Sequence, residues 1–426
     1  MVDNTAGIAT PPVIVPRSEH NISRQQIDDD TLKVLYRLNR HGYRALLVGG
    51  CVRDLLLGRQ PKDFDVATNA TPNQVKKLFR NCFLVGRRFR LAHIRFAGGN
   101  LIEVATFRRE ATAADLPDDE SEHRHAAENV FGTPAEDAFR RDFTINSLFY
   151  DIADFSLIDY TGGLQDLVDR KLRVIGDPWV RFAEDPVRML RALEFAARLD
   201  FTLGPRAQAA LREQATLIET AAPARIRDEF LELIRHRVAG KVLRSAAGCG
   251  LLGPLLNGYD GDETTYALFE QLDRRPATDP VTEGAALALL FLTRFRARCD
   301  ALETHSVAAA AKLAGQLLTP HCAYFHIANG IRHQARELLV GCYRLAQGRG
   351  QRGENRFLRN PCTAEALRLY TLFSMTTGVE TEIVSAWQQA AVATRTPAAI
   401  PTEPGAARPP RRRRRRRKAT APRAQD

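Results

Sequence analysis

The sequence predicts an α/β head, built as a small mixed sheet with helices, followed by an all-α neck and body and a disordered basic C-terminal tail. Between residues 45 and 107, short apolar runs with β character alternate with helical segments bounded by glycine and proline. Residues 240–392 are rich in alanine and leucine and show helical periodicity without strand alternation. The chain ends in a run of arginines behind a linker of proline, alanine and threonine, which is typical of a solvated tail.

The predicted domain borders follow these shifts in composition. With 426 residues, of which 44% are hydrophobic, the chain is long enough for two or three domains with a substantial core. The predicted parts are a disordered N-terminus (1–20), a head (21–175), a helical neck (176–240), a helical body (241–393) and a disordered Arg-rich tail (394–426).

Charge, apolar runs and cysteines narrow the class of protein. The net charge is +11, but residues 395–426 hold +9 of it, so the rest of the chain is nearly neutral. The longest apolar run, residues 285–292, is far shorter than the ~20 residues that a membrane-spanning helix needs, so no membrane span is expected. The N-terminal 20 residues lack a basic start followed by an apolar region, so secretion is not expected. Seven cysteines, odd in number and without a C-x-x-C pair, fit reduced thiols in a cytoplasm.

The head is organised around a glycine turn and a pair of acids. Residues 45–57 predict a buried strand, a turn at Gly49 and Gly50 and a short helix, and Asp63 and Asp65 alternate with apolar residues in a second predicted strand. Side chains two positions apart on a strand face the same way, so these two carboxylates would lie side by side and suit Mg²⁺ or Mn²⁺. A glycine turn that opens a helix lets backbone N–H groups approach phosphates. Each feature alone can be a solvated turn or a plain loop, but their close succession favours a site for a metal-chelated triphosphate.

These residues carry a resemblance to a known family. Residues 49–54 (GGCVRD), followed by residues 63–65 (DFD), resemble the signature of the nucleotidyltransferase superfamily, in the group shared by bacterial poly(A) polymerases and class II CCA-adding enzymes. The resemblance covers chiefly residues 20–240. It implies an α/β nucleotidyltransferase head in which the glycine pair and Arg53 hold the triphosphate.

A basic turn lies between two strand-like pieces at residues 83–94. Three arginines at a turn, as in residues 87–90 (RRFR), are ordinarily a solvated face, but near a triphosphate they can hold phosphates or an RNA backbone. The segment is similar to the element that distinguishes bacterial poly(A) polymerases from CCA-adding enzymes.

Glu103 lies inside the next predicted strand, residues 101–107. An acid within such an apolar run is either solvent-facing or a third metal ligand that faces Asp63 and Asp65. The family resemblance favours the ligand.

Residues 136–150 show helical periodicity, which would place Asp142 and Asn146 on one face, four residues apart. They form either a charged rim satisfied by Arg141 or, together with Arg141, a border of the nucleotide site. Residues 140–146 (RRDFTIN) resemble the family's second motif, which favours the nucleotide site and counts Asp142 among the catalytic carboxylates. Whether Asp142 contacts metal, ribose or a neighbouring arginine stays open.

A third motif starts a long predicted helix at Asp185 and Pro186, where Asp185 is also a sound N-cap. Arg188 and Arg191 follow at spacings of three on the same flank. A carboxylate that accepts from an exocyclic amino group, beside a guanidinium that donates to a ring nitrogen, would admit adenine and cytosine and reject guanine and uracil. Residues 184–188 (EDPVR) resemble the family's base-recognition motif, which does not separate A from C.

The resemblance implies template-independent transfer of AMP from ATP to the 3′-hydroxyl of RNA with release of pyrophosphate, a step of RNA processing and decay. Asp63 and Asp65 are expected to hold two metal ions about 4 Å apart, with Glu103 or Asp142 completing the carboxylate set. The tail, Arg411 to Lys418, is expected to attract RNA without regard to sequence.

Two other functions compete with this interpretation. A tRNA CCA-adding nucleotidyltransferase would share every catalytic motif, but the basic turn at residues 87–90 and the basic tail favour polyadenylation. A non-catalytic RNA-binding protein on a transferase fold would not need the acid pair, the glycine turn and the base-reading pair together. The sequence does not specify protein partners.

Overall fold

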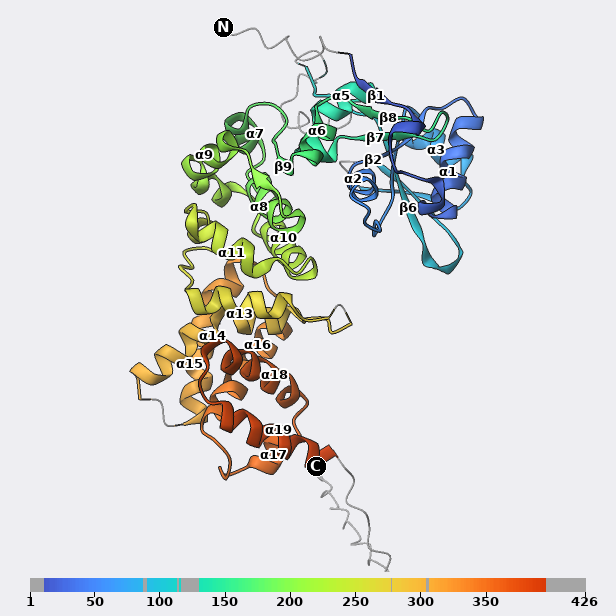
Figure 1. Cartoon of the computed structure of the whole chain (residues 1–426). Coiled ribbons are helices and arrows are strands. Elements are labelled where there is room, and N and C mark those ends of the chain that lie inside the picture. The colour runs from blue at the N-terminus through green and yellow to red at the C-terminus, as the bar shows by residue number, and fades with distance from the viewer. Residues whose placement is uncertain are drawn as a thin grey trace, which may run out of the picture.

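The structure is a computed structural model that describes residues 11–86, 90–112, 115, 130–276, 278–303 and 306–395. The chain runs from an α/β head through a helical neck to a helical body, and the three parts follow one another in an elongated molecule (Figure 1). This confirms the predicted fold class. Residues 396–426 of the predicted Arg-rich tail, residues 87–89 of the basic turn and residues 1–10 lie outside the described residues, and α19 extends to Arg395, two residues into the predicted tail.

The head contains an eight-stranded mixed sheet with the strand order β1-β8-β7-β2-β3-β6-β5-β4. β3 and β6 pair in parallel, and the other neighbours pair antiparallel. The strands are β1 (Val13–Val15), β2 (Ala45–Val48), β3 (Asp65–Thr68), β4 (Cys82–Val85), β5 (Leu91–Arg95), β6 (Leu101–Thr106), β7 (Phe149–Asp151) and β8 (Leu157–Asp159). β2 is buried along its whole length, as its apolar sequence predicts.

Short helices complete the head: α1 (Asp29–Arg40), α2 (Gly50–Leu56), α3 (Pro72–Leu78), α5 (Pro134–Phe139) and α6 (Gly163–Val168). Asp28 caps α1 by accepting the N–H groups of Asp30 and Thr31 at 3.0 and 2.9 Å. The apolar stripe of α1, which includes Val34 and Leu38, is fully buried in the same core as β2.

Two sequence-based expectations for the head are wrong. Residues 11–20, predicted to be disordered, belong to the head, because β1 pairs with β8 and His20 hydrogen-bonds through Nε2 to the Phe155 carbonyl at 2.8 Å. Residues 136–150 are not one helix: α5 ends at Phe139, a 3-10 turn follows, and β7 begins at Phe149. The apolar spacing that imitates a helix here instead serves a strand held between β2 and β8.

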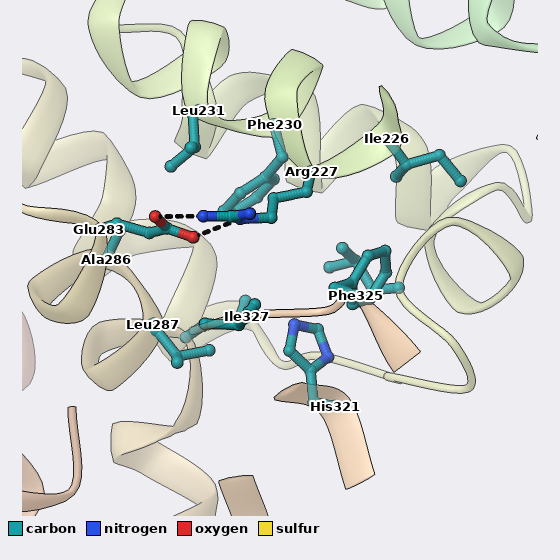
Figure 2. Close-up of a pocket in the computed structure, with 12 residues that line it drawn as sticks. Ile226, Arg227, Phe230, Leu231, Glu283, Ala286, Leu287, His321, Phe325 and Ile327 are labelled. Carbon is teal, nitrogen blue, oxygen red and sulfur yellow. Dashed lines mark hydrogen bonds and ion pairs between the residues drawn. The ribbon is translucent and has the colours of Figure 1, made fainter. Parts of the chain in front are cut away.

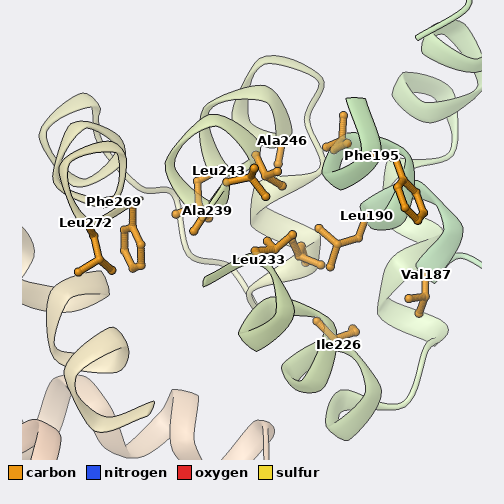
Figure 3. Close-up of a cluster of buried hydrophobic side chains, with 14 of the residues drawn as sticks. Val187, Leu190, Phe195, Ile226, Leu233, Ala239, Leu243, Ala246, Phe269 and Leu272 are labelled. Carbon is orange, nitrogen blue, oxygen red and sulfur yellow. The ribbon is translucent and has the colours of Figure 1, made fainter. Parts of the chain in front are cut away.

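The neck is formed by α7 (Pro178–Glu184), α8 (Val187–Leu199), α9 (Pro205–Glu213), α10 (Pro223–Arg235) and α11 (Ala239–Gly248), with a small parallel pair of β9 (Lys171–Leu172) and β10 (Thr202–Leu203). Its core brings Leu190 of α8, Leu233 of α10 and Leu243 of α11 together, and the same cluster continues to Phe269 of the body (Figure 3). Neck and body therefore share one continuous apolar core.

The body contains α12 (Leu252–Leu255), α13 (Glu263–Asp273), α14 (Glu283–Ala301), α15 (Val307–Tyr324), α16 (Asn329–Ala346), α17 (Glu354–Leu358), α18 (Pro361–Thr377) and α19 (Thr381–Arg395). No strand occurs among its described residues, as predicted. Residues 284–292 of α14 are all buried, and the helix packs on α16, which accounts for the unbroken apolar run in its first half. Within the described ranges, no helix combines the length and the apolar character needed to cross a membrane.

Candidate active site

The acid pair and the third predicted acid meet on neighbouring strands of the head. Asp65 opens β3 and stands opposite Glu103 in the parallel β3–β6 register. Glu103 in turn stands opposite His93 of β5, and its Oε2 lies 3.2 Å from His93 Nε2. Residues opposite each other in a sheet point to the same face, so Asp65 and Glu103 share one surface. The structure therefore brings together two of the three predicted metal ligands.

Asp63 lies just outside the strand, because β3 begins at Asp65 rather than at Asp63. Its side chain is 75% exposed, and Lys62 Nζ lies 3.9 Å from it. The predicted alternation nevertheless holds for the apolar residues, since Phe64 and Val66 are buried. Asp63 is close enough to Asp65 for its charge to raise the pKa of the Asp65 carboxyl.

The pKa of the Asp65 carboxyl shows how the charges of this group act on one another. Partial burial of its carboxylate, then the charges of Glu103 and Asp63, raise its pKa from 3.8 to about 6, and Arg141 opposes this shift. Asp65 keeps solvent-exposed surface, so solvent screens part of the repulsion. No ion pair is formed by Asp65 with any other described residue. A divalent cation would relieve the repulsion, and three carboxylates are hard oxygen donors of the kind that Mg²⁺ and Mn²⁺ prefer. The donor atoms of Asp65 and Glu103 suit such an ion, although the described side chains form no group of three or more acids, histidines or cysteines arranged to hold one.

The glycine turn lies beside this group. Gly49 follows β2 with φ 80° and ψ −134°, a conformation that favours glycine, and a Cβ there would come within 3.4 Å of Arg141 Nη1. Arg141 is held in place by Asp137, whose Oδ2 accepts from Nε and Nη2 at 3.1 and 2.8 Å. Asp137 is buried and also binds Arg140, so it fixes two arginines at the rim of the turn. Arg141 is thus the cation placed between the glycine turn and Asp65.

Two other predicted substrate-binding residues, Arg53 and Asn146, are buried in a polar network. Arg53 is only 2% exposed; its Nε donates to Asp54 at 2.8 Å and its Nη1 donates to Asn146 Oδ1 at 2.6 Å. Asn146 also donates to Asp142 Oδ1 at 3.4 Å. In this structure Arg53 and Asn146 connect α2 to the segment after α5, and their direct contact with substrate stays a prediction.

Asp142 binds an arginine of the neck. Its Oδ2 accepts from Arg191 Nε and Nη2 at 3.0 and 2.8 Å, and its Oδ1 accepts from the Phe143 N–H at 2.8 Å. Burial alone would raise the pKa of Asp142, but the charge and hydrogen bonds of Arg191 lower it below the usual value. Asp142 and Arg191, which motif reasoning assigned to catalysis and substrate binding, therefore join the head to α8. Glu103, rather than Asp142, is the acid that lies opposite Asp65.

The predicted base-reading pair stands at the start of α8. Asp185 caps the end of α7, and Pro186, rather than the predicted Asp185, is the N-cap of α8. Asp185 Oδ1 accepts the Val187 N–H at 3.3 Å, and the two oxygens of Asp185 also accept from Arg225 of α10 at 2.9 and 2.8 Å. Arg188 donates to Glu184 Oε2 at 3.1 Å and lies 4.0 Å from Asp185. Both members of the pair are therefore held by neighbours before any base binds.

An apolar cavity of about 30 Å³ lies away from this group, where the neck meets the body (Figure 2). Arg227 of α10 forms a two-point ion pair with Glu283 of α14 at its edge, at 2.5 and 2.7 Å. His321 faces the cavity, and burial lowers its pKa to about 4, so it is neutral at pH 7. The small volume, neutralised charge and apolar lining do not suit a triphosphate.

Sequence reasoning missed two residues that shape the site. Asp137 of α5 orients Arg141, which follows the helix, and the signal was present in the sequence as an acid four residues before an arginine. Arg225 binds Asp185 from 40 residues away, and no local pattern reveals such a pairing. Both act on the site residues rather than on a substrate directly.

Two acids on neighbouring strands of a mixed sheet, a glycine turn at the end of the adjacent strand and a helical neck are the features that the sequence resemblance predicts for a nucleotidyltransferase. Comparisons agree. Residues 45–173 match the family described as the poly A polymerase head domain, and residues 200–261 match the family described as the probable RNA and SrmB-binding site of polymerase A.

Relatives and solved structures point the same way. The chain is 54% identical over 226 residues to poly(A) polymerase I of Salmonella typhi, which covers 52% of this chain and 48% of that protein. It is 37% identical over 230 residues to a CCA-adding enzyme of Bacillus licheniformis, covering 54% and 56%. The Bacillus stearothermophilus CCA-adding enzyme, solved with CTP, superimposes with a TM-score of 0.64 at 25% identity, covering 87% and 82%.

The chain is therefore similar to the family of nucleotidyltransferases that includes bacterial poly(A) polymerases and CCA-adding enzymes. It spans about half the length of the poly(A) polymerase I relative from Salmonella typhi. Members of this family generally use divalent metal ions.

Proposed function

We propose that this chain transfers AMP from ATP to the 3′-hydroxyl of RNA without a template and releases pyrophosphate. The observation that carries the proposal is the register of β3 and β6, which sets Asp65 against Glu103 beside Asp63, one strand away from the Gly49 turn. The 54% identity to a poly(A) polymerase I over 226 residues supports adenylyl transfer as the reaction.

Each part of the site has a role in this proposal. Asp63, Asp65 and Glu103 would hold Mg²⁺ or Mn²⁺, which when bound would activate the primer hydroxyl and neutralise charge on the leaving pyrophosphate. Gly49 and Gly50 let the backbone approach the triphosphate, and Arg141 offers Nη1 beside them. Because Asp137 holds Arg141 through its other nitrogens, the guanidinium is pre-oriented toward the phosphates.

Asp185 and Arg188 would read the base. Oδ1 of Asp185 accepts from both Arg225 and the Val187 N–H, but Oδ2 has a lone pair beyond the one that Arg225 uses, so the carboxylate can still accept from an exocyclic amino group. Arg188 would donate to the adjacent ring nitrogen. The same pair admits adenine and cytosine, so it excludes guanine and uracil only.

The proposal includes the setting of the reaction. RNA 3′ ends would be held partly by the basic tail, Arg411 to Lys418, through counterion release. We place the enzyme in the cytoplasm, where ATP and RNA occur together and where the pattern of cysteines fits reduced thiols.

CCA addition to tRNA is the second candidate, because the structural match to a CCA-adding enzyme extends over 87% of this chain. The test offers the full-length protein ATP alone or CTP with ATP, on tRNA lacking its 3′ end or on an unstructured RNA. Long AMP tails on the unstructured RNA are expected. Incorporation of CMP, restricted to the tRNA, would show that the chain is a CCA-adding enzyme instead.

A further inference from the structure

A long groove runs along the outer face of α18 in the body, bordered by the ends of α13 and α19. It encloses about 880 Å³ and is far larger than the cavity at the neck–body junction. α18 is 17 residues long and packs on both α13 and α19, so the groove has rigid helical walls. At 1.5 Å per residue, this length matches a partner helix of about 25 Å.

The floor of the groove is aliphatic and open to solvent. Leu367 and Leu372 of α18 contribute to it, and Met375 and Val392, at its α19 end, are each 67% exposed. Met375 is an adaptable apolar side chain of the kind used at protein-binding surfaces. Exposed apolar side chains gathered in one groove, rather than scattered singly, mark an interaction surface.

The rim of the groove is cationic. Four arginines line it, and no acid does. Arg275 and Arg368 share Asp279, which lies just outside the lining. Arg274 and Arg359 are exposed and form no ion pair with any other described residue. A partner would therefore meet an aliphatic floor with unneutralised positive charge on two sides.

We propose that this groove binds an acidic amphipathic helix of a partner protein, with the partner's aliphatic face on α18 and its carboxylates on Arg274 and Arg359. Such a helix places apolar anchors at i, i+3, i+4 and i+7, which fits a groove of this length. Its acids pair with the arginines at the rim, where charge steers association and fixes orientation.

RNA fits the groove less well than a protein helix does. Single-stranded RNA binds best where aromatic side chains stack on its bases, and none of the described residues that line the groove is aromatic. Eight of the 17 lining residues are apolar, and a ribose-phosphate backbone does not use such side chains. Both RNA and an acidic helix are attracted by positive charge, so the experiment includes RNA as a competitor.

The test uses the full chain and a fluorescein-labelled peptide of about 18 residues, with leucines at i, i+3, i+4 and i+7 and glutamates elsewhere, measured by polarisation at about 150 mM salt. A peptide of the same composition in scrambled order removes the apolar face but keeps the charge. Saturable binding is expected for the amphipathic peptide, at least about 10-fold tighter than for the scrambled one.

Variants locate the site. Met375→Glu and Arg359→Glu are each expected to lower the affinity for the amphipathic peptide by about 10-fold. Both positions are exposed, so the fold tolerates the substitutions. Val168→Glu is the matched control, because Val168 is 77% exposed on α6 of the head, and it should leave the affinity unchanged. Circular dichroism melts confirm that each variant is folded.

Three results overturn the proposal. If the amphipathic and the scrambled peptide bound equally well, general attraction between charges would account for the binding, and the groove would not recognise an apolar helix face. If Val168→Glu lowered the peptide affinity as much as the two groove variants do, the peptide would bind outside the groove. Displacement of the peptide by an unstructured RNA, with RNA affinity lost in both Met375→Glu and Arg359→Glu, would show that the groove is an RNA site.

Discussion

Replacing Asp65 by asparagine is expected to stabilise the metal-free protein while it removes the metal site. Burial, Glu103 and Asp63 raise the pKa of Asp65 from 3.8 to about 6. A shift of about 2 pKa units corresponds to about 3 kcal/mol at neutral pH, and solvent screening of this exposed residue reduces the expected effect to about 1 kcal/mol. For a head of this size, that is a rise in Tm of about 2–4 °C.

The sign follows from proton linkage. Between about pH 4 and pH 6 the folded protein keeps a proton on Asp65 that the unfolded chain has lost, so folding stability falls as the pH rises through this window. Above pH 6 the carboxylate is ionised and the penalty is complete. Asp65→Asn removes the titration, so this part of the pH dependence should disappear in the variant.

The assay is thermal unfolding with EDTA or with Mg²⁺, for the wild type, Asp65→Asn and the control Glu219→Gln. Glu219 is an exposed acid in the neck, so it matches the change of acid to amide away from the site. Mg²⁺ should raise the Tm of the wild type and of the control, since a ligand that binds only the folded state stabilises it, and should leave Asp65→Asn unchanged. A lower Tm for Asp65→Asn in EDTA, or an equal response to Mg²⁺ in all three proteins, would refute the reasoning.

Three further predictions concern other parts of the chain. Arg191→Met leaves the partly buried Asp142 carboxylate without its cation and should cost about 1–3 kcal/mol in urea unfolding at pH 7. Because the pKa of Asp142 is lowered, this loss should shrink as the pH falls below about 4, and a cost under about 0.5 kcal/mol at pH 7 would contradict the pairing. Gly49→Ala adds a Cβ at φ 80° and should cost about 1–3 kcal/mol and most of the adenylyl transfer rate, measured on a variant shown to be folded, whereas normal activity would mean that the turn does not approach the triphosphate. Deletion of residues 395–426 should weaken RNA binding and flatten its dependence on salt while sparing turnover at saturating primer; lost turnover at saturation would make the tail more than an anchor.

Local patterns in the sequence predicted the parts of the site that depend on local structure. The strand at residues 45–48, the glycine turn and the helix after it all occur, and Glu103 lies on the same face as Asp65. These predictions succeed because strand alternation and glycine at a positive φ are properties of a few consecutive residues.

The failures share a different cause. Residues 11–20 look featureless until β1 finds β8 across more than 140 residues, and β7 resembles helix until β2 and β8 hold it as a strand. Strand formation depends on the partner as much as on the segment. In the same way, the pairing of Asp185 with Arg225 and of Asp142 with Arg191 arises only when the neck helices pack together and against the head.

The most direct test of the account is the single-turnover rate of AMP incorporation into an unstructured RNA with ATP and Mg²⁺, for the wild type and for folded Asp65→Asn. The account predicts that the wild type extends the RNA with release of one pyrophosphate for each AMP added, and that the variant loses at least about 100-fold in rate, as expected when an electrostatic group of the transition state is removed. An unchanged rate in the variant would show that the carboxylates of β3 and β6 are not the centre of the chemistry.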